Sequence, residues 1–137
     1  MIAFFDSSAL IYLIEGNEPF ASKVRKELAG AFKRHPSLEA GLSRLTWLEC
    51  RVGPMKAHDH ATLAAFDLFF ARADLVWVEL TKEVVELAAA IRVKHGLKTP
   101  DALQAASCLQ RGADHLFLTG DSSFNRVSGL SVKLLTG

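Results

Sequence analysis

Four acidic residues stand at predicted segment boundaries, and their side chains could together bind a divalent cation. Asp6 and Asp121 each follow an apolar run that is typical of a buried parallel strand, while Glu49 and Asp101 fall in the predicted first turns of two helices. Strand carboxyl ends and helix amino ends lie along one edge of an open parallel sheet, where ligands bind. Hard divalent cations prefer carboxylate oxygens, so this edge is predicted to bind one.

Each acid also has a local interpretation. Asp6 is a good helix cap, and Glu49 is the third residue after Thr46 in a capping-box pattern. Asp101 suits the positive end of a helix dipole, and Asp121 suits a turn. If the acids do converge, two charges about 4 Å apart repel by roughly 4 kcal/mol at an effective dielectric near 20, and a cation would relieve that repulsion.

The remaining sequence predicts strands that alternate with helices. Strands are expected at residues 2–5, 38–45, 75–78, 114–118 and 131–135. Helices are expected at residues 9–14, 19–34, 46–52, 58–72, 81–95 and 99–111. This alternation predicts an α/β fold, with one domain over residues 1–137 and a central, mostly parallel sheet of four or five strands flanked by helices.

Local signals set the expected helix ends. Thr46 is expected to cap a short helix that Gly53 and Pro54 stop. Thr99, followed by a proline at the first helical position, is expected to cap the helix that carries Asp101.

Composition excludes several classes of protein. Half of the 137 residues are hydrophobic, which suffices for a sizeable core, and the formal net charge of +1 does not indicate a polyanion partner for the chain as a whole. The two cysteines lack metal-like spacing and are expected to be free thiols in a reducing compartment. No signal peptide or membrane span is recognisable, so we expect a cytoplasmic protein.

The chain resembles the PIN-domain family, and most closely the VapC-type toxins of toxin–antitoxin pairs. The resemblance covers nearly the whole length. It rests on four motifs in order, which are Asp6-Ser7-Ser8-Ala9-Leu10, Glu49 with Gly53, Asp101-Ala102-Leu103-Gln104-Ala105-Ala106, and Gly112-Ala113-Asp114 leading to Thr119-Gly120-Asp121-Ser122-Ser123-Phe124.

This resemblance implies a metal-dependent ribonuclease. Asp6, Glu49, Asp101 and Asp121 would be its catalytic acids and would hold Mg²⁺ or Mn²⁺, directly or through water. The hydroxyls of Ser8 and Thr119 would support the acids, and a hydroxyl hydrogen bond to Asp6 would fix its orientation. Metal-activated water would attack an RNA phosphodiester and leave a 5′-phosphate product.

The resemblance also implies protein partners. Toxins of this kind are silenced by a small antitoxin whose tail crosses the acidic cleft, and they commonly form homodimers. Leu68 and Phe69 lie off the apolar stripe of their helix, and together with Phe20 and Phe32 they are candidates for such surfaces. The alternative is that all four residues belong to the ordinary core.

RNA binding would need cationic side chains near the acids, because phosphate binding is electrostatic. Arg44 and Arg51 flank Glu49 in the sequence, and Lys98 lies three residues before Asp101. These three residues are the predicted RNA contacts. The identity of the target RNA is not readable from the sequence.

Two other functions fit parts of the pattern. A haloacid-dehalogenase-like phosphatase also has an Asp after its first strand, but it usually needs a second acid two residues later, where this chain has Ser8. A PIN-like module that binds RNA or protein without catalysis is the other alternative. Its function would tolerate Asp6→Asn, whereas that of a nuclease would not.

Overall fold

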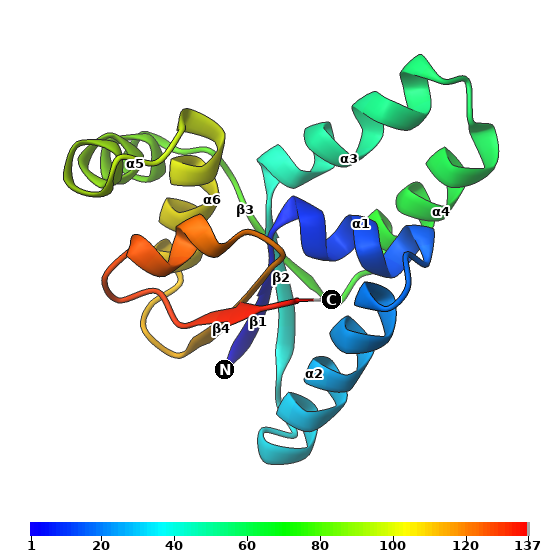
Figure 1. Cartoon of the computed structure of the whole chain (residues 1–137), viewed down its shortest axis with the longest axis horizontal. Helices are drawn as coiled ribbons and strands as arrows, with labels where there is room; N and C mark the ends of the chain where they lie inside the picture. The colour runs from blue at the N-terminus through cyan, green and yellow to red at the C-terminus, as the bar shows by residue number, and fades with distance from the viewer. Residues whose placement is uncertain (137) are drawn as a thin grey trace.

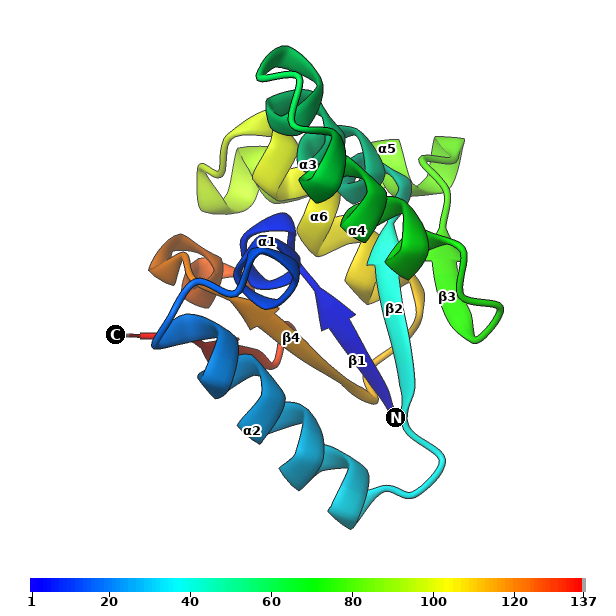
Figure 2. The same cartoon turned by 90° about the vertical axis from the view of Figure 1, so that its right-hand side faces the viewer.

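The computed structural model describes residues 1–136, which form a five-stranded parallel sheet between two layers of helices (Figures 1 and 2). The strands are β1 (Ile2–Phe5), β2 (Glu39–Ser43), β3 (Leu75–Val78), β4 (His115–Thr119) and β5 (Val132–Leu134). Every strand pairing is parallel, and the order is β3-β2-β1-β4-β5. The predicted α/β class is therefore confirmed. The predicted domain extends to residue 137, which lies outside the described residues.

Six α-helices and one short 3₁₀ helix join these strands within residues 1–136. They are α1 (Ser7–Glu15), α2 (Phe20–Arg34), α3 (Arg44–Lys56), α4 (His60–Phe70), α5 (Lys82–His95), α6 (Thr99–Gln110) and the 3₁₀ helix η1 (Ser122–Arg126). None of the helices in this part of the chain has both the length and the apolar character that crossing a membrane requires.

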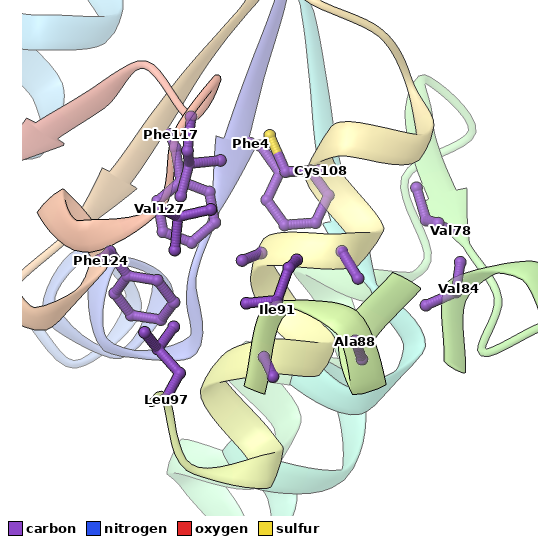
Figure 3. Packing of buried hydrophobic residues seen from close by; sticks show 14 residues of the cluster. Phe4, Val78, Val84, Ala88, Ile91, Leu97, Cys108, Phe117, Phe124 and Val127 are labelled. Atoms are coloured by element: carbon purple, nitrogen blue, oxygen red, sulfur yellow. The ribbon is translucent and has the colours of Figure 1, made fainter. Parts of the chain in front are cut away.

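The two faces of the sheet bury separate hydrophobic clusters. On one face, Phe4 stacks on Phe117 with ring centroids 5.7 Å apart, and α5, α6 and η1 cover the pair (Figure 3). On the other face, Phe5 and Leu118 pack under α1, α2, α3 and α4. Burial of both faces explains why β1 is entirely apolar and why β4 is apolar from Leu116 to Leu118.

Strand β2 contains a glycine because its neighbour leaves no room for a side chain. A Cβ atom added at Gly41 would collide with the side chain of Ile2 on the adjacent strand β1. The glycine that weakens the sequence pattern of this strand therefore serves close packing between the strands.

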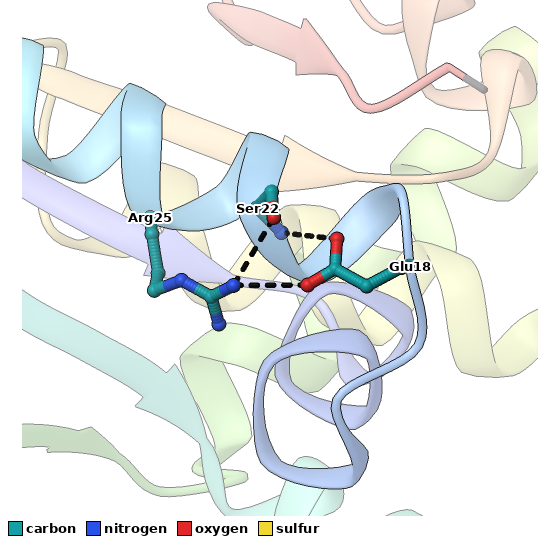
Figure 4. Close-up of polar contacts among 3 residues, drawn as sticks. All are labelled: Glu18, Ser22 and Arg25. Carbon is teal, nitrogen blue, oxygen red and sulfur yellow. Dashed lines mark hydrogen bonds and ion pairs between the residues drawn. The ribbon is translucent and has the colours of Figure 1, made fainter.

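Helix α2 begins without a side-chain cap from its N-cap residue, Pro19. Instead, the Glu18 carboxylate accepts a hydrogen bond from the Ser22 backbone N–H at 3.2 Å and pairs with Arg25 at 2.9 Å (Figure 4). Phe20, Val24, Leu28 and Phe32 recur every four residues in the sequence, which predicts that they form one buried stripe. Val24 is fully buried as expected, but Phe32, near the end of the helix, is 58% exposed, so its predicted burial is wrong.

The predicted start and end of the third helix are also wrong. Ser43 caps α3 by accepting a hydrogen bond from the Leu45 backbone N–H at 3.1 Å, so Thr46 lies inside the helix. Glu49 is accordingly in the second turn and not the first. The helix continues past Pro54, because a proline removes only one helical hydrogen bond and the Ala57 N–H still bonds to the Gly53 carbonyl at 3.0 Å.

Helix α6 agrees with its prediction to within one residue. Its N-cap is Lys98 rather than Thr99, and Asp101 lies in the first turn, as expected. The chain lays β2 and β3 on one side of β1, and β4 and β5 on the other. The carboxyl ends of β1 and β4 therefore form the switch point of the sheet, which is where open α/β sheets bind ligands.

Candidate metal site and its acidic residues

Asp6 lies at the switch point, directly after β1, and is 7% exposed. Its Oδ1 accepts a hydrogen bond from the Ser7 backbone N–H at 2.7 Å. Its Oδ2 accepts hydrogen bonds from the hydroxyl of Ser8 at 2.9 Å and the hydroxyl of Thr119 at 2.6 Å. The hydroxyl bonds that the sequence predicts for Ser8 and Thr119 are therefore present, and they fix the carboxylate.

The same two hydroxyls attach the loop that carries Asp121 to Asp6. The Gly120 backbone N–H donates to Ser8 Oγ at 3.0 Å, and the Asp121 backbone N–H donates to Thr119 Oγ1 at 3.0 Å. Two chains of two hydrogen bonds each thus connect the loop after β4 to Asp6 Oδ2, one through Ser8 and one through Thr119. They keep the fourth acid at the edge that holds the first.

Glu49 reaches this edge from α3 and is half-buried. Its Oε1 accepts a hydrogen bond from the Ser7 hydroxyl at 2.6 Å and another from Gln104 Nε2 at 3.1 Å. Ser7 therefore contacts both acids, since its backbone N–H bonds to Asp6 and its hydroxyl bonds to Glu49. Sequence reasoning missed Ser7 and Gln104 as parts of the site, although each lies within three residues of a predicted acid.

Asp101 and Asp121 line the open part of the site. Asp101 is half-buried in the first turn of α6, and Asp121 is exposed and caps η1. They border a cavity of about 230 Å³ whose wall also carries two cations, Lys98 and Arg126. Neither cation forms a salt bridge with another residue in the range 1–136. Arg126 was not predicted, and it lies only five residues after Asp121.

The acids interact electrostatically through the site. Burial raises the pKa of Asp6 from 3.8 to about 6, although its three hydrogen bonds oppose the shift and the charge of Asp101 adds to it. The pKa of Asp101 is also raised, first by burial and then by the charges of Asp121 and Glu49. These shifts indicate carboxylates that share one region and disfavour one another's ionisation.

The donor atoms fit a hard divalent cation such as Mg²⁺ or Mn²⁺. All four side chains offer carboxylate oxygens, and a bound cation would offset the repulsion that raises the pKa of Asp101. The nearby thiol of Cys50 is unsuited to metal binding, because burial raises its pKa and keeps it protonated. No three His, Cys, Asp or Glu side chains within residues 1–136 lie close enough to ligate one ion directly, so such an ion would be held partly through water.

The three predicted RNA contacts differ in their surroundings. Lys98 borders the cavity beside Asp101. Arg44 is paired with Glu79 at 2.8 Å and lies 4.0 Å over the ring of Trp77. Arg51 is paired with Asp67 at 2.9 Å, which turns it toward α4. The RNA-binding role stays a prediction for all three.

The four candidates for partner surfaces divide into two pairs. Leu68 is 77% exposed and Phe32 is 58% exposed. Phe69 instead packs edge-on against Phe5, with ring centroids 6.1 Å apart, and Phe20 stacks on Tyr12 at 4.5 Å. The core interpretation therefore holds for Phe69, which packs against a core cluster, whereas Phe20 is half-buried and lies against Tyr12, outside the core clusters. Further exposed apolar side chains, not predicted from the sequence, lie on α3 and are Trp47, Leu48, Val52 and Met55.

Several solved structures that are similar to this chain are toxin–antitoxin proteins. The chain is similar to VapBC2 from Rickettsia felis, whose structure was solved bound to a DNA fragment from the VapBC2 promoter. The two chains are 15% identical, the match covers 99% of this chain and 100% of that chain, and the TM-score is 0.78. It is similar to VapBC-1 from nontypeable Haemophilus influenzae, with 18% identity, full coverage of both chains and a TM-score of 0.73. A toxin–antitoxin complex from Klebsiella pneumoniae has 23% identity, 98% coverage of both chains and a TM-score of 0.69.

None of the curated proteins compared with this sequence matches it. The sequence model of the PIN domain, however, matches residues 3–130, which excludes the haloacid-dehalogenase alternative. The match spans β1, the four acids and the switch point of the sheet. The chain belongs to the PIN-domain family.

Proposed function

We propose that this protein is a metal-dependent endoribonuclease and the toxin of a VapBC-type toxin–antitoxin pair. Membership in the PIN-domain family supports a nuclease, and the likeness to toxin–antitoxin structures supports the toxin role. Because its substrate would be cellular RNA, we expect it to act in the cytoplasm. Mg²⁺ or Mn²⁺ would be its cofactor.

One observation supports the proposal most strongly. Asp6 is a buried carboxylate whose pKa is raised to about 6, at the point of the sheet where ligands bind. Asp6 is also the N-cap of α1, but capping a helix does not require so buried a carboxylate, and functional sites accumulate groups with perturbed pKa values. A cation beside Asp6 would stabilise its ionised form and explain why an acid occupies this position.

The chain's own residues would have separate tasks in the reaction. Asp6 Oδ1 accepts only one hydrogen bond from residues 1–136, so it retains a lone pair for a cation. Glu49 and Asp101 would add carboxylate oxygens from α3 and α6, and Asp121 would complete the set through water. When bound, the metal would activate a water molecule and offset negative charge on the phosphate.

RNA would approach through the cavity beside Asp101 and Asp121. Lys98 and Arg126 would contact phosphates there, and attraction to them would balance the repulsion between acids and RNA. Arg44 and Arg51 remain candidates for more distant contacts, provided that RNA displaces their carboxylate partners.

A cognate antitoxin would be a small separate protein that covers the acidic site. The exposed apolar side chains of α3, together with Leu68 of α4, suit a partner surface, because large exposed apolar patches mark interaction sites. A homodimer would use another exposed face, and its formation is part of the same proposal.

The proposal is tested by incubating purified, antitoxin-free protein with total cellular RNA and Mg²⁺ or Mn²⁺. Asp6→Asn protein and a chelator-treated sample serve as controls, with circular dichroism to verify folding of the variant. We expect discrete fragments that disappear in both controls. Their 5′ ends, mapped by sequencing, would identify the target RNA.

Two other outcomes would lead to different conclusions. Cleavage that survives Asp6→Asn would reject the assigned site. Binding of RNA without cleavage, by folded wild-type and Asp6→Asn protein alike, would favour the non-catalytic binding module.

A further inference from the structure

Gln104 is a buried amide that connects three helices at the acidic site. It is 1% exposed and lies on α6, three residues after Asp101, so the two side chains lie on one face of that helix. Its Nε2 is within hydrogen-bonding distance of Thr46 Oγ1 at 2.9 Å, Ser7 Oγ at 3.1 Å and Glu49 Oε1 at 3.1 Å.

The hydrogen bonds around this amide converge on Glu49. Ser7 has one hydroxyl proton, and its shortest contact is with Glu49 Oε1 at 2.6 Å. Gln104 has two amide protons, of which one suits Thr46 Oγ1 and the other suits Glu49 Oε1 or Ser7 Oγ. Oε1 of Glu49 is thus held from the interior, while its Oε2 accepts no hydrogen bond from residues 1–136.

The other end of the same side chain is unsatisfied. Gln104 Oε1 is buried and has no hydrogen-bond partner within residues 1–136. A buried polar atom without a partner destabilises a fold, and a methionine would fill a similar volume without that cost. Packing alone therefore does not explain why position 104 carries an amide. A need for the hydrogen bonds that Nε2 donates would explain it.

Electrostatics supply that requirement. Glu49 on α3 and Asp101 on α6 carry like charges on two helices that contact each other, so their carboxylates repel. The Gln104 amide is anchored on the helix that carries Asp101, and it donates a hydrogen bond to Glu49. It therefore opposes separation of α3 and α6 near the two acids.

We propose that Gln104 is a positioning residue that holds Glu49, and through it the pair Glu49–Asp101, in the geometry that binds a divalent cation. This inference rests on the proposed metal-dependent function. It assigns no direct contact between Gln104 and the metal or RNA.

The test compares the wild type with Gln104→Met and Gln104→Leu. Both substitutions remove the amide and replace it with apolar atoms of similar volume. Isothermal titration with Mn²⁺ alone measures metal affinity, and RNA cleavage gives kcat and KM. Both variants should bind Mn²⁺ about tenfold more weakly, as expected for loss of a residue that orients a ligand. They should also have a lower kcat with KM for RNA unchanged, and a melting temperature that is equal or higher.

Ser107→Ala is the matched control. Ser107 is buried on the same helix, and its hydroxyl donates to the Leu103 carbonyl at 2.7 Å without contacting an acid. This variant should keep the Mn²⁺ affinity and kcat of the wild type even if its melting temperature falls.

The outcomes separate this inference from the proposed function. Wild-type Mn²⁺ affinity and kcat in both Gln104 variants would overturn the positioning role alone, as would equal losses in Ser107→Ala. If the wild type binds Mn²⁺ but cleaves no RNA, the proposed function fails, and the Mn²⁺ titrations still decide the role of Gln104. A wild type that binds no Mn²⁺ would overturn both.

Discussion

The two halves of the acidic site differ in how much of their geometry the protein itself fixes. Asp6 and Glu49 are held by backbone, hydroxyl and amide donors at 2.6 to 3.1 Å. Asp101 and Asp121 border an open cavity beside Lys98 and Arg126, which form no salt bridge with the residues that the structure describes. The first half is therefore arranged before any ligand arrives, and the second is shaped to receive one.

This difference has an energetic cause. In the half that contains Asp6 and Glu49 (the buried half), Asp6 and Gln104 are almost fully buried, so their polar atoms need protein partners, although Gln104 Oε1 has none among residues 1–136. In the half that contains Asp101 and Asp121 (the open half), both carboxylates border the open cavity, so water can solvate their charges. We expect substitutions in the buried half to change both stability and activity, and those in the open half to change mainly binding.

The largest difference should appear between Asp6→Asn and Asp121→Asn in the RNA cleavage assay. Asp6→Asn removes a charge that three hydrogen bonds stabilise, and we expect at least a roughly 100-fold loss of kcat/KM. Asp121→Asn should lose no more than about tenfold, because its carboxylate is exposed and would act through water. A greater loss from Asp121→Asn would reverse the roles assigned to the two halves.

Stability should fall as the pH rises, because of Asp6. Its pKa is 3.8 in the unfolded chain and about 6 in the folded one, so the folded state binds the proton more tightly. This contribution is present below pH 4 and is lost by about pH 6, a change of about 3 kcal/mol in the free energy of unfolding. Several surface acids have lowered pKa values and act in the opposite direction, so the difference between wild type and Asp6→Asn isolates the effect.

Urea unfolding of both proteins at pH 4 and pH 7 provides that measurement. Wild type should lose about 3 kcal/mol relative to Asp6→Asn between these values, and added Mg²⁺ should reduce the loss at pH 7. A pH-independent difference between the two proteins would show that Asp6 is not perturbed by burial.

Thr119→Val tests how the buried half holds its charge. The Thr119 hydroxyl donates to Asp6 at 2.6 Å, and its removal should cost about 1.5–3 kcal/mol at pH 7, as for other hydrogen bonds to charged groups. The cost should shrink at pH 4, where Asp6 is protonated. Thr99→Val, which alters an exposed hydroxyl on α6, is the control. If Thr119→Val lowered the free energy of unfolding equally at pH 4 and pH 7, the prediction would be contradicted.

Smaller effects should come from Lys98→Ala and Arg126→Ala in the open half. Each should weaken RNA binding a few-fold and lower the slope of log affinity against log salt concentration by about one, with Mn²⁺ binding unchanged. Arg44→Ala and Arg51→Ala should change RNA affinity less, because both arginines are already paired with carboxylates. Larger effects from these two would place the RNA path along α3 instead of the cavity.

Sequence patterns predicted the elements well where one local signal acts alone. The helix expected at residues 81–95 is α5, which Thr81 and Gly96 cap, and the apolar runs of β1 and β4 lie in the interior of the sheet. The start of α3 failed because two caps compete over a few residues. Ser43 accepts the hydrogen bond of the Leu45 N–H and so caps the helix. The Thr46 hydroxyl lies inside the helix and instead accepts a hydrogen bond from Gln104.

Side-chain environment was less predictable than element type. Phe69 and Leu68 are neighbours in α4, yet one packs on Phe5 and the other is 77% exposed, because only one of the two directions faces the sheet. Arg44 and Arg51 seemed available to RNA beside Glu49. Their pairing with Glu79 and Asp67 depends on chain segments 35 and 16 residues away.

The sequence by itself determined the order of the acids and their place at the ends of strands and helices, since caps, apolar runs and turns act over a few residues. Only the tertiary structure decided that Ser7, Thr46, Glu49 and Gln104 form one hydrogen-bonded cluster. Ser7 and Gln104 are separated by 97 residues, and their contact exists because the parallel sheet brings α1, α3 and α6 to the same edge. No local pattern encodes that meeting, since it depends on the order in which the strands pair.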